Sequence, residues 1–321
     1  MRKRVTVSIM AVIVILVCLV IFISYTKSTT SCEPTLRYLN GIQRSQLINT
    51  ELNGNQYNSP VGIVALGLSN NYKNWTIYTK SVRGIANISQ LNAVSSIGYN
   101  HSGSSLQLNA VLYTCTNDIQ NVYWLQNVVR FDQYTSKLEF AENIWNFSYT
   151  YGNMQQQPLS NNYSKPVPYE LPLNISVLIN ITTSAHNTEV NFYYQTYNKT
   201  TRRWDSVLYK KVNISNSHGS RIVIAPAITP VPTYSDLEFV FAGPGDRSID
   251  YFSFLNAHLG LFYFNNTTNS YADFPEYFTK GRDTGEVSYD LKSTISNDQA
   301  TVQTDMPKVT IGNVVAVNNS N

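Results

Sequence analysis

Short apolar runs that alternate with polar residues constrain this chain most. From Leu106 to Leu112, and again from Leu173 to Ile181, every second residue is apolar. A period of two places those side chains on one face of a β-strand. Further strands are predicted at 120–129, 137–147, 188–197, 203–214, 220–226, 235–242, 257–264 and 285–291. Many short strands at this spacing, rich in β-branched and aromatic residues, predict an all-β fold, a large antiparallel β-sandwich.

The N-terminus has the pattern of an export signal. Basic residues from Arg2 to Arg4 precede an apolar run from Val5 to about Ser24, and about 20 apolar residues suffice for a membrane-spanning helix. We expect a single-pass signal anchor with the ectodomain outside the cell, or alternatively a long, cleaved signal peptide. The expected division is 1–25 signal peptide or anchor, 26–57 linker or pro-segment, 58–295 β-sandwich domain and 296–321 polar tail.

Two further features fit an exported chain. About a dozen Asn-x-Ser/Thr sequons, such as those at Asn74 and Asn146, predict N-glycans, although a chain rich in Asn, Ser and Thr also forms sequons by chance. Cys18 lies inside the apolar run, so Cys32 and Cys115 are the only cysteines that could form an external disulfide. Sequence alone does not show that these two meet.

The low content of charged residues limits the possible partners and conditions. The chain has 23 Lys+Arg and 20 Asp+Glu, and only 13% of its residues are charged. Without basic clusters beyond the N-terminus, we expect no nucleic-acid binding. Three cysteines and four scattered histidines give no metal-site pattern, and no phosphate or dinucleotide motif predicts a cofactor. A surface with few charges also avoids the self-repulsion that strong acid imposes when carboxylates become neutral.

Two predicted strands carry polar side chains in unusual positions. On the first, Gln126 shares a face with Val122, Trp124 and Val128, and a buried amide without a partner costs about 1–3 kcal/mol. On the second, Glu238 lies in a run of apolar residues, where partial burial would perturb its ionisation. The alternative is that Gln126 bonds a neighbouring loop and that the Glu238 face points to water.

Several segments resemble the thermopsin family of archaeal acid proteases, and they occur in the family's order over about residues 58–292. They are Pro60–Leu68, Trp124–Val128 with Phe131, Asn143–Asn146, Asp236–Val240, His258–Tyr263 and Gly281–Glu286. The resemblance implies a secreted or surface endopeptidase that acts on polypeptides at very low pH and high temperature without a metal. Where that family has a glycine run, this chain has Gly243-Pro244-Gly245, which we expect to alter a substrate-binding loop.

A catalytic pair follows as a hypothesis. The segments around Gln126 and Glu238 also resemble those of the glutamic proteases, in which a Gln and a Glu flank the attacking water. Glu238 would then be general base and later general acid, and Gln126 on a neighbouring strand would stabilise the oxyanion. Trp124, Gly243 and Gly245 would line the substrate cleft.

Two alternatives remain open at this point. The first is an aspartic-type pair that shares a proton, drawn from Asp236, Asp283 and Glu286; Asp132, Glu139 and Glu142 are lesser candidates, expected at the surface or at strand edges. The second is a noncatalytic β-sandwich that serves as a surface glycoprotein or binding module.

Overall fold

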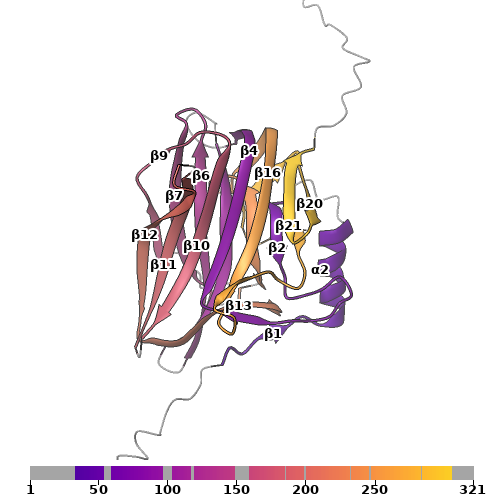
Figure 1. Cartoon of the computed structure of the whole chain (residues 1–321). Helices are drawn as coiled ribbons and strands as arrows, with labels where there is room; N and C mark the ends of the chain where they lie inside the picture. Colours follow the sequence, from indigo (N-terminus) through magenta and orange to yellow (C-terminus); the bar gives the residue numbers. More distant parts are fainter. Residues whose placement is uncertain are drawn as a thin grey trace, which may run out of the picture. The chain divides into compact units, whose positions relative to one another are not determined.

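Two β-sheets face each other across a shared apolar core (Figure 1). The computed structural model describes residues 33–53, 59–96, 103–116, 119–148, 159–184, 186–198, 200–231, 233–245, 247–282 and 284–305. Within these ranges the pairing is antiparallel except where β16 (Ile249–Asn265) meets β19 (Val287–Tyr289). The predicted all-β sandwich is confirmed.

In the described part of the chain the first sheet has twelve strands. Its main path is β18 (Phe278–Lys280), β2 (Val61–Ala65), β15 (Leu237–Ala242), β5 (Ser104–Thr116), β6 (Ile119–Asp132), β7 (Lys137–Asn146) and β8 (Ser160–Tyr163). The strands off this path are β1 (Arg37–Tyr38), β3 (Ile77–Thr79), β9 (Val167–Pro168), β13 (Ser217–Ile228) and β14 (Tyr234–Ser235).

The second sheet has nine strands within the same ranges. Its main path is β12 (Arg203–Ser215), β11 (Asn187–Asn198), β10 (Leu173–Thr183), β4 (Ser81–Ser95), β16, β21 (Gln299–Thr304) and β20 (Leu291–Ser296). The short strands β17 (Ser270–Ala272) and β19 pair with β16.

The alternation in the sequence explains how the first sheet is buried on both faces. On β5, Leu106 and Leu108 point into the core between the sheets. Val111 and Tyr113 lie on the opposite, outer face, where they form a separate apolar cluster with Val122 of β6. Since apolar residues occupy both faces of β5, its outer face is covered by other parts of the chain rather than by water.

A helix from the segment 26–57, which was expected to be a linker or pro-segment, covers part of that outer face. Helix α2 (Gly41–Asn53) begins at Asn40, whose Oδ1 accepts from the backbone N–H of Gln43, while the Gln43 Oε1 accepts from the N–H of Asn40. This reciprocal pair is a capping box. Leu47 and Ile48 of α2 are buried against the outer face of the first sheet.

The C-terminal boundary also differs from the expected one. Residues from 296 onward were expected to be a tail, yet β20 and β21 form a hairpin that pairs with β16. Ala300 and Val302 are fully buried in the main core. The described residues from Pro34 to Asp305 form one compact unit, so the sandwich includes elements on both sides of the expected 58–295 domain.

The predicted signal segment at residues 1–25 lies outside the described residues. Among those that are described, no helix is both long and apolar enough to span a membrane. Cys115 on β5 is in a disulfide, and Cys18 and Cys32 fall in the undescribed part of the chain.

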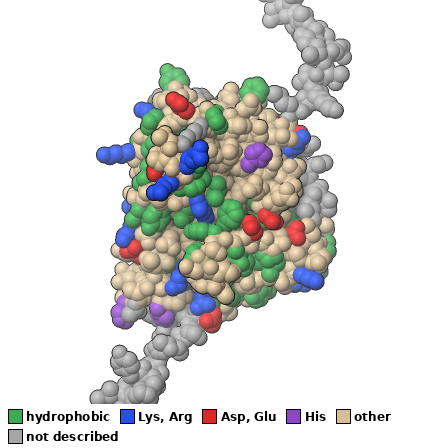
Figure 2. Space-filling view, viewed as in Figure 1, with side chains coloured by type: hydrophobic (Ala, Val, Ile, Leu, Met, Phe, Trp, Pro, Cys, Tyr) green, Lys and Arg blue, Asp and Glu red, His purple; other side chains and the backbone are tan. Residues whose placement is uncertain are grey.

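The visible surface carries few charges. In the face shown in Figure 2, uncharged polar side chains and backbone dominate, and the Lys, Arg, Asp and Glu side chains are scattered among them. This distribution agrees with the 13% charged residues of the sequence. Solubility here therefore depends more on Asn, Ser, Thr and Tyr than on ion pairs.

Candidate active site

A cavity of about 550 Å³ lies over the outer face of the first sheet. Strands β5, β6, β7 and β8 supply its floor, and the loops that follow β13, β15 and β18 supply its walls. Trp124, Gln126 and Gly245, all predicted as site residues, line it. The cavity therefore brings together parts of the sequence that are more than 100 residues apart.

A chain of side-chain amides runs across the cavity floor. Asn143 on β7 donates through Nδ2 to Gln126 Oε1 at 3.0 Å, and Gln126 Nε2 donates to Gln107 Oε1 at 3.0 Å. Gln107 Nε2 then donates to the Ser105 hydroxyl at 2.9 Å and to the carbonyl of Gly243 at 3.2 Å. Each amide thus donates in the same direction along the chain, which fixes the orientation of Gln126 in its strand.

Glu238 is fully buried beside this floor, on β15. Its Oε2 accepts from Asn109 Nδ2 at 3.2 Å, and its Oε1 accepts from the backbone N–H of Arg282. Gly281 packs against the carboxyl group so closely that a Cβ there would lie 2.9 Å from Oε2. Arg282 lines the cavity, so the Glu238 carboxyl lies directly behind that part of the cavity wall.

Glu238 and Gln126 lie on the same face of the sheet but not on neighbouring strands. Strand β5 runs between them, with Asn109 directly opposite both Glu238 and Gln126. The expectation of neighbouring strands is therefore wrong. Two strand spacings of about 4.8 Å separate their backbones by about 9.6 Å.

Aromatic rings form one wall of the cavity. Trp124 on β6 stacks on Phe147 with ring centroids 5.9 Å apart and an angle of 12° between the ring planes. Trp145 of β7 and Tyr163 of β8 also line the cavity. These rings offer an apolar surface next to the amide floor, which suits bulky apolar side chains of a polypeptide.

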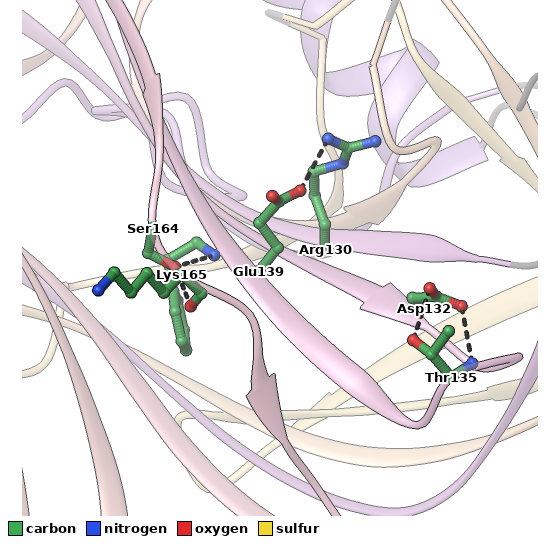
Figure 3. A network of polar contacts seen from close by, with 7 residues as sticks. Arg130, Asp132, Thr135, Glu139, Ser164 and Lys165 are labelled. Carbon is green, nitrogen blue, oxygen red and sulfur yellow. Dashed lines mark hydrogen bonds and ion pairs between the residues drawn. The ribbon is translucent and has the colours of Figure 1, made fainter.

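Charged groups lie at the edge of the cavity. Arg130 of β6 pairs with Glu139 of β7 at 3.1 Å (Figure 3) and lies over the ring of Tyr163. Arg247, Arg282 and Glu286 also line the cavity. Glu286 is the one carboxylate among the described lining residues, and its Oε1 accepts from the backbone N–H of Arg247 at 3.4 Å.

The other predicted acids are distributed differently. Asp236 is buried but is not among the cavity-lining residues, and Asp283 lies outside the described residues. Asp132 is exposed and accepts from the N–H and the hydroxyl of Thr135 in the turn after β6 (Figure 3). Glu139 is the partly exposed partner of Arg130. Of the described candidate acids, Glu286 lines the cavity and Glu238 lies behind its wall.

Glu142 was expected at the surface or at a strand edge, yet it is fully buried. It lies opposite Asn127, and its Oε1 accepts from the Ser160 hydroxyl at 2.6 Å and from Asn162 Nδ2 at 3.1 Å. Burial raises the pKa of Glu142, and the two hydrogen bonds oppose that rise. Since Asn127 binds carbonyls of the second sheet, at Leu178 and Tyr193, Glu142 belongs to the space between the sheets and not to the cavity.

The two glycines have different roles. Gly245 has a φ of +136°, which few other residues tolerate, and it lines the cavity. Gly243 lies behind the wall, where a Cβ would be 2.1 Å from the Ser248 hydroxyl oxygen. Its carbonyl accepts from Ser105 and Gln107, so Gly243 anchors the amide floor instead of contacting the cavity.

Two polar residues of the site, Gln107 and Asn109, were not predicted. Both alternate with leucines on β5 and would ordinarily be assigned to a solvent-facing side, but only 2% of Gln107 and 1% of Asn109 is exposed. The sequence of the same strand does indicate that these residues are buried, because the apolar residues Val111 and Tyr113 lie on the same face as Gln107 and Asn109. An apolar continuation of a polar face indicates that the face is covered.

A second buried acid lies near the wall of the cavity. Asp250 on β16 is fully buried, opposite Ser95 of β4. The pKa of Asp250 is raised to about 8, chiefly by burial; the Ser95 hydroxyl opposes the rise and the charge of Glu286 adds to it. At acid pH this group is therefore a neutral carboxylic acid.

Comparison with known proteins agrees with this geometry. A family model described as Thermopsin matches residues 46–291. The chain is also 27% identical over 267 residues to Thermopsin from Sulfolobus acidocaldarius, an alignment that covers 74% of this chain and 77% of that protein. The matched range includes the amide floor, Glu238 and the 281–286 segment. The resemblance seen in the sequence is confirmed: the chain belongs to the thermopsin family and is a thermopsin-like peptidase.

Proposed function

We propose that this protein is an endopeptidase that cleaves polypeptides at low pH and high temperature, without a metal, by carboxyl-activated attack of water. The observation that carries the proposal is the arrangement of Gln126 in the cavity floor and Glu238 behind the adjoining wall, both on one face of the sheet. Their backbones are about 9.6 Å apart, and Asn109 lies between them, bonded to the Glu238 carboxyl. The aromatic wall gives a neighbouring side chain of the substrate an apolar subsite.

The proton transfers follow from the groups present. Glu238 takes a proton from water, the oxygen of that water attacks the peptide carbonyl carbon, and Glu238 then gives the proton to the leaving nitrogen. Gln126 has two N–H bonds and uses one toward Gln107, so the other can donate to the oxyanion of the tetrahedral intermediate. No proton is gained or lost over the cycle.

Ionisation of Glu238 in acid is the demanding step, because burial favours its neutral form. Two donors act in the opposite sense: the backbone N–H of Arg282 and the side-chain amide of Asn109. Hydrogen bonds to a carboxylate stabilise its charged form. These contacts support a general base that keeps a reactive ionised fraction at low pH.

The test is E238Q in the full-length protein, assayed against a denatured protein substrate across acid pH. We expect the rate to fall by about 100-fold or more, the usual contribution of a general acid–base group, with an unchanged melting temperature. E142Q is the matched control, because Glu142 is equally buried on the same sheet but lies away from the cavity. Wild-type cleavage by E238Q would contradict the assignment, and cleavage by neither variant nor wild type would favour a noncatalytic module.

An aspartic-type pair is a second assignment for the same reaction. Glu286 lines the cavity itself, whereas Glu238 does not. Asp283 lies three positions before it in the chain, and Asp236 was the other candidate for that pair. If E286Q or D283N abolishes cleavage while E238Q only lowers the melting temperature, the pair at the edge of the cavity is catalytic and Glu238 holds the 281–286 segment in place.

We also propose that the enzyme acts outside the cell, tethered by the apolar segment at residues 5–24 and carrying N-glycans. The support is the basic N-terminus before that segment and the dozen or so sequons after it. N-terminal sequencing of protein purified from its native membrane would distinguish a retained anchor from a cleaved signal. Activity that persists after dialysis against a chelator would support the metal-independent mechanism.

A further inference from the structure

Asn109 is the buried polar residue that the proposed mechanism leaves least explained. It occupies the central position of a cross-strand row, directly opposite Glu238 on one side and Gln126 on the other. Gln126 bonds Gln107 and its other cross-strand neighbour, Asn143, and not Asn109. Asn109 donates through Nδ2 to Glu238 Oε2 at 3.2 Å, so its amide is turned toward the acid.

The other end of that amide has no hydrogen-bond partner among the described residues. Asn109 Oδ1 is buried and unpaired, and an unmet acceptor in such a place costs about 1–3 kcal/mol. Oδ1 lies within about 6 Å of Glu238 Oε2, because the two polar atoms of an amide are only two short bonds apart. A donor that is to pair with Asn109 Oδ1 must therefore lie close to Glu238.

The protonated form of Glu238 supplies such a donor. An ionised carboxylate only accepts hydrogen bonds, whereas a carboxylic acid has one O–H to donate. A primary amide matches both forms, since its N–H donates to the carboxylate and its carbonyl, after rotation of the amide, accepts from the acid. We infer that Asn109 is a positioning residue for Glu238, which holds the carboxyl group in both protonation states of the catalytic cycle.

The inference rests on the proposed role of Glu238. Two other described residues that contact or face that carboxyl offer no group that could accept its proton. The backbone N–H of Arg282 can only donate, and Val64, opposite Glu238 on β2, is apolar. The charged groups nearby are Asp236, two residues earlier in the chain, the Arg282 guanidinium, which lies over Tyr234, and Lys280 at the end of β18.

The test compares N109L and N109D with wild type through pH profiles of kcat and kcat/KM in the full-length protein. N109L keeps the branched shape at Cγ but replaces both polar atoms with larger methyl groups, so the ionised form of Glu238 loses a donor. We expect kcat to fall about tenfold or more with KM within about twofold, and the acid limb to move up by about one pH unit, as loss of one charged hydrogen bond implies. N109D should retain activity while the new carboxyl is protonated and lose it as the pH rises and that carboxyl ionises beside Glu238.

N191L is the matched control. Asn191 on β11 is also buried, also donates to a glutamate, Glu189, at 3.0 Å, and also has an unpaired Oδ1, but it belongs to the other sheet. The acid limb of the pH profile of N191L should stay at the wild-type position. A wild-type profile for N109L beside an inactive E238Q would overturn the role of Asn109 alone, whereas an active E238Q would overturn both proposals. If N109L does not fold, the pH profile of N109D decides. An N109D profile identical to that of wild type would overturn the inference.

Discussion

At the scale of single residues, Gly281 packs directly against the Glu238 carboxyl group. A methyl group there would lie 2.9–3.1 Å from the three terminal atoms of the Glu238 side chain. We expect G281A to displace the carboxyl or the adjoining Arg282 backbone, at a cost of about 1–3 kcal/mol in unfolding free energy, with a matching loss of activity. G41A is the control, because nothing lies within 4 Å of the added atom. Equal urea midpoints for the two variants would show that the contact is not restrictive.

Residues also show where sequence reasoning about the site succeeded and where it stopped. Gln126 and Trp124 could be placed from one strand, since alternation fixes which side chains share a face. Asn109 could not, because its importance depends on the pairing of β5 with both β6 and β15, and pairing between strands more than 100 residues apart leaves no local pattern. For the same reason the strand between Glu238 and Gln126 was not foreseen.

At the scale of elements, α2 is the clearest difference from the sequence prediction. Among its described side chains, at residues 41–49, only Leu47 and Ile48 are buried, so its apolar period is too weak to detect, although Asn40 and Gln43 form a recognisable cap. Strand β4 was also missed, because a bulge opposite β16 interrupts its alternation. Strands with regular alternation, by contrast, were predicted to within a few residues.

Helix α2 therefore carries a prediction about stability. We expect L47A to lower the free energy of unfolding by about 2–5 kcal/mol, since Leu47 is 3% exposed and packs with Val64 and Phe278. I42A, on the exposed side of the same helix at 72% exposure, should change it by no more than about 0.5 kcal/mol. Chemical unfolding measures both. Equal midpoints would mean that the segment is the dispensable linker expected from its composition.

At the scale of the whole molecule, buried acids link folding to pH. Burial raises the pKa of Asp250 to about 8 and also raises that of Glu142. The folded state therefore holds protons that the unfolded chain releases above about pH 4, so this stabilisation is complete below that pH and is lost as pH rises toward 8. We expect the wild-type melting temperature to fall between pH 4 and pH 8. The free energy of unfolding should decrease by at most about 1.4 kcal/mol per pH unit for each acid.

D250N should flatten that slope, because an amide in the same place does not ionise. D132N is the control, since Asp132 is exposed and the turn with Thr135 lowers its pKa, the opposite direction. An identical slope for D250N and wild type would show that Asp250 does not contribute. The same measurement would show whether a fold with so few charged residues is most stable in acid.

The amide floor of the cavity has a consequence for how such an enzyme meets changing acidity. Asn143, Gln126, Gln107 and Ser105 bind one another through groups that neither gain nor lose protons between neutral water and strong acid. The donors and acceptors of the amide floor therefore stay the same from neutral to strongly acidic pH. A change of pH alters only the protonation of the carboxyl groups around the floor. Under the proposed mechanism, Gln126 could therefore donate to the oxyanion at any pH, and only the ionisation of the carboxyl groups would set the pH dependence.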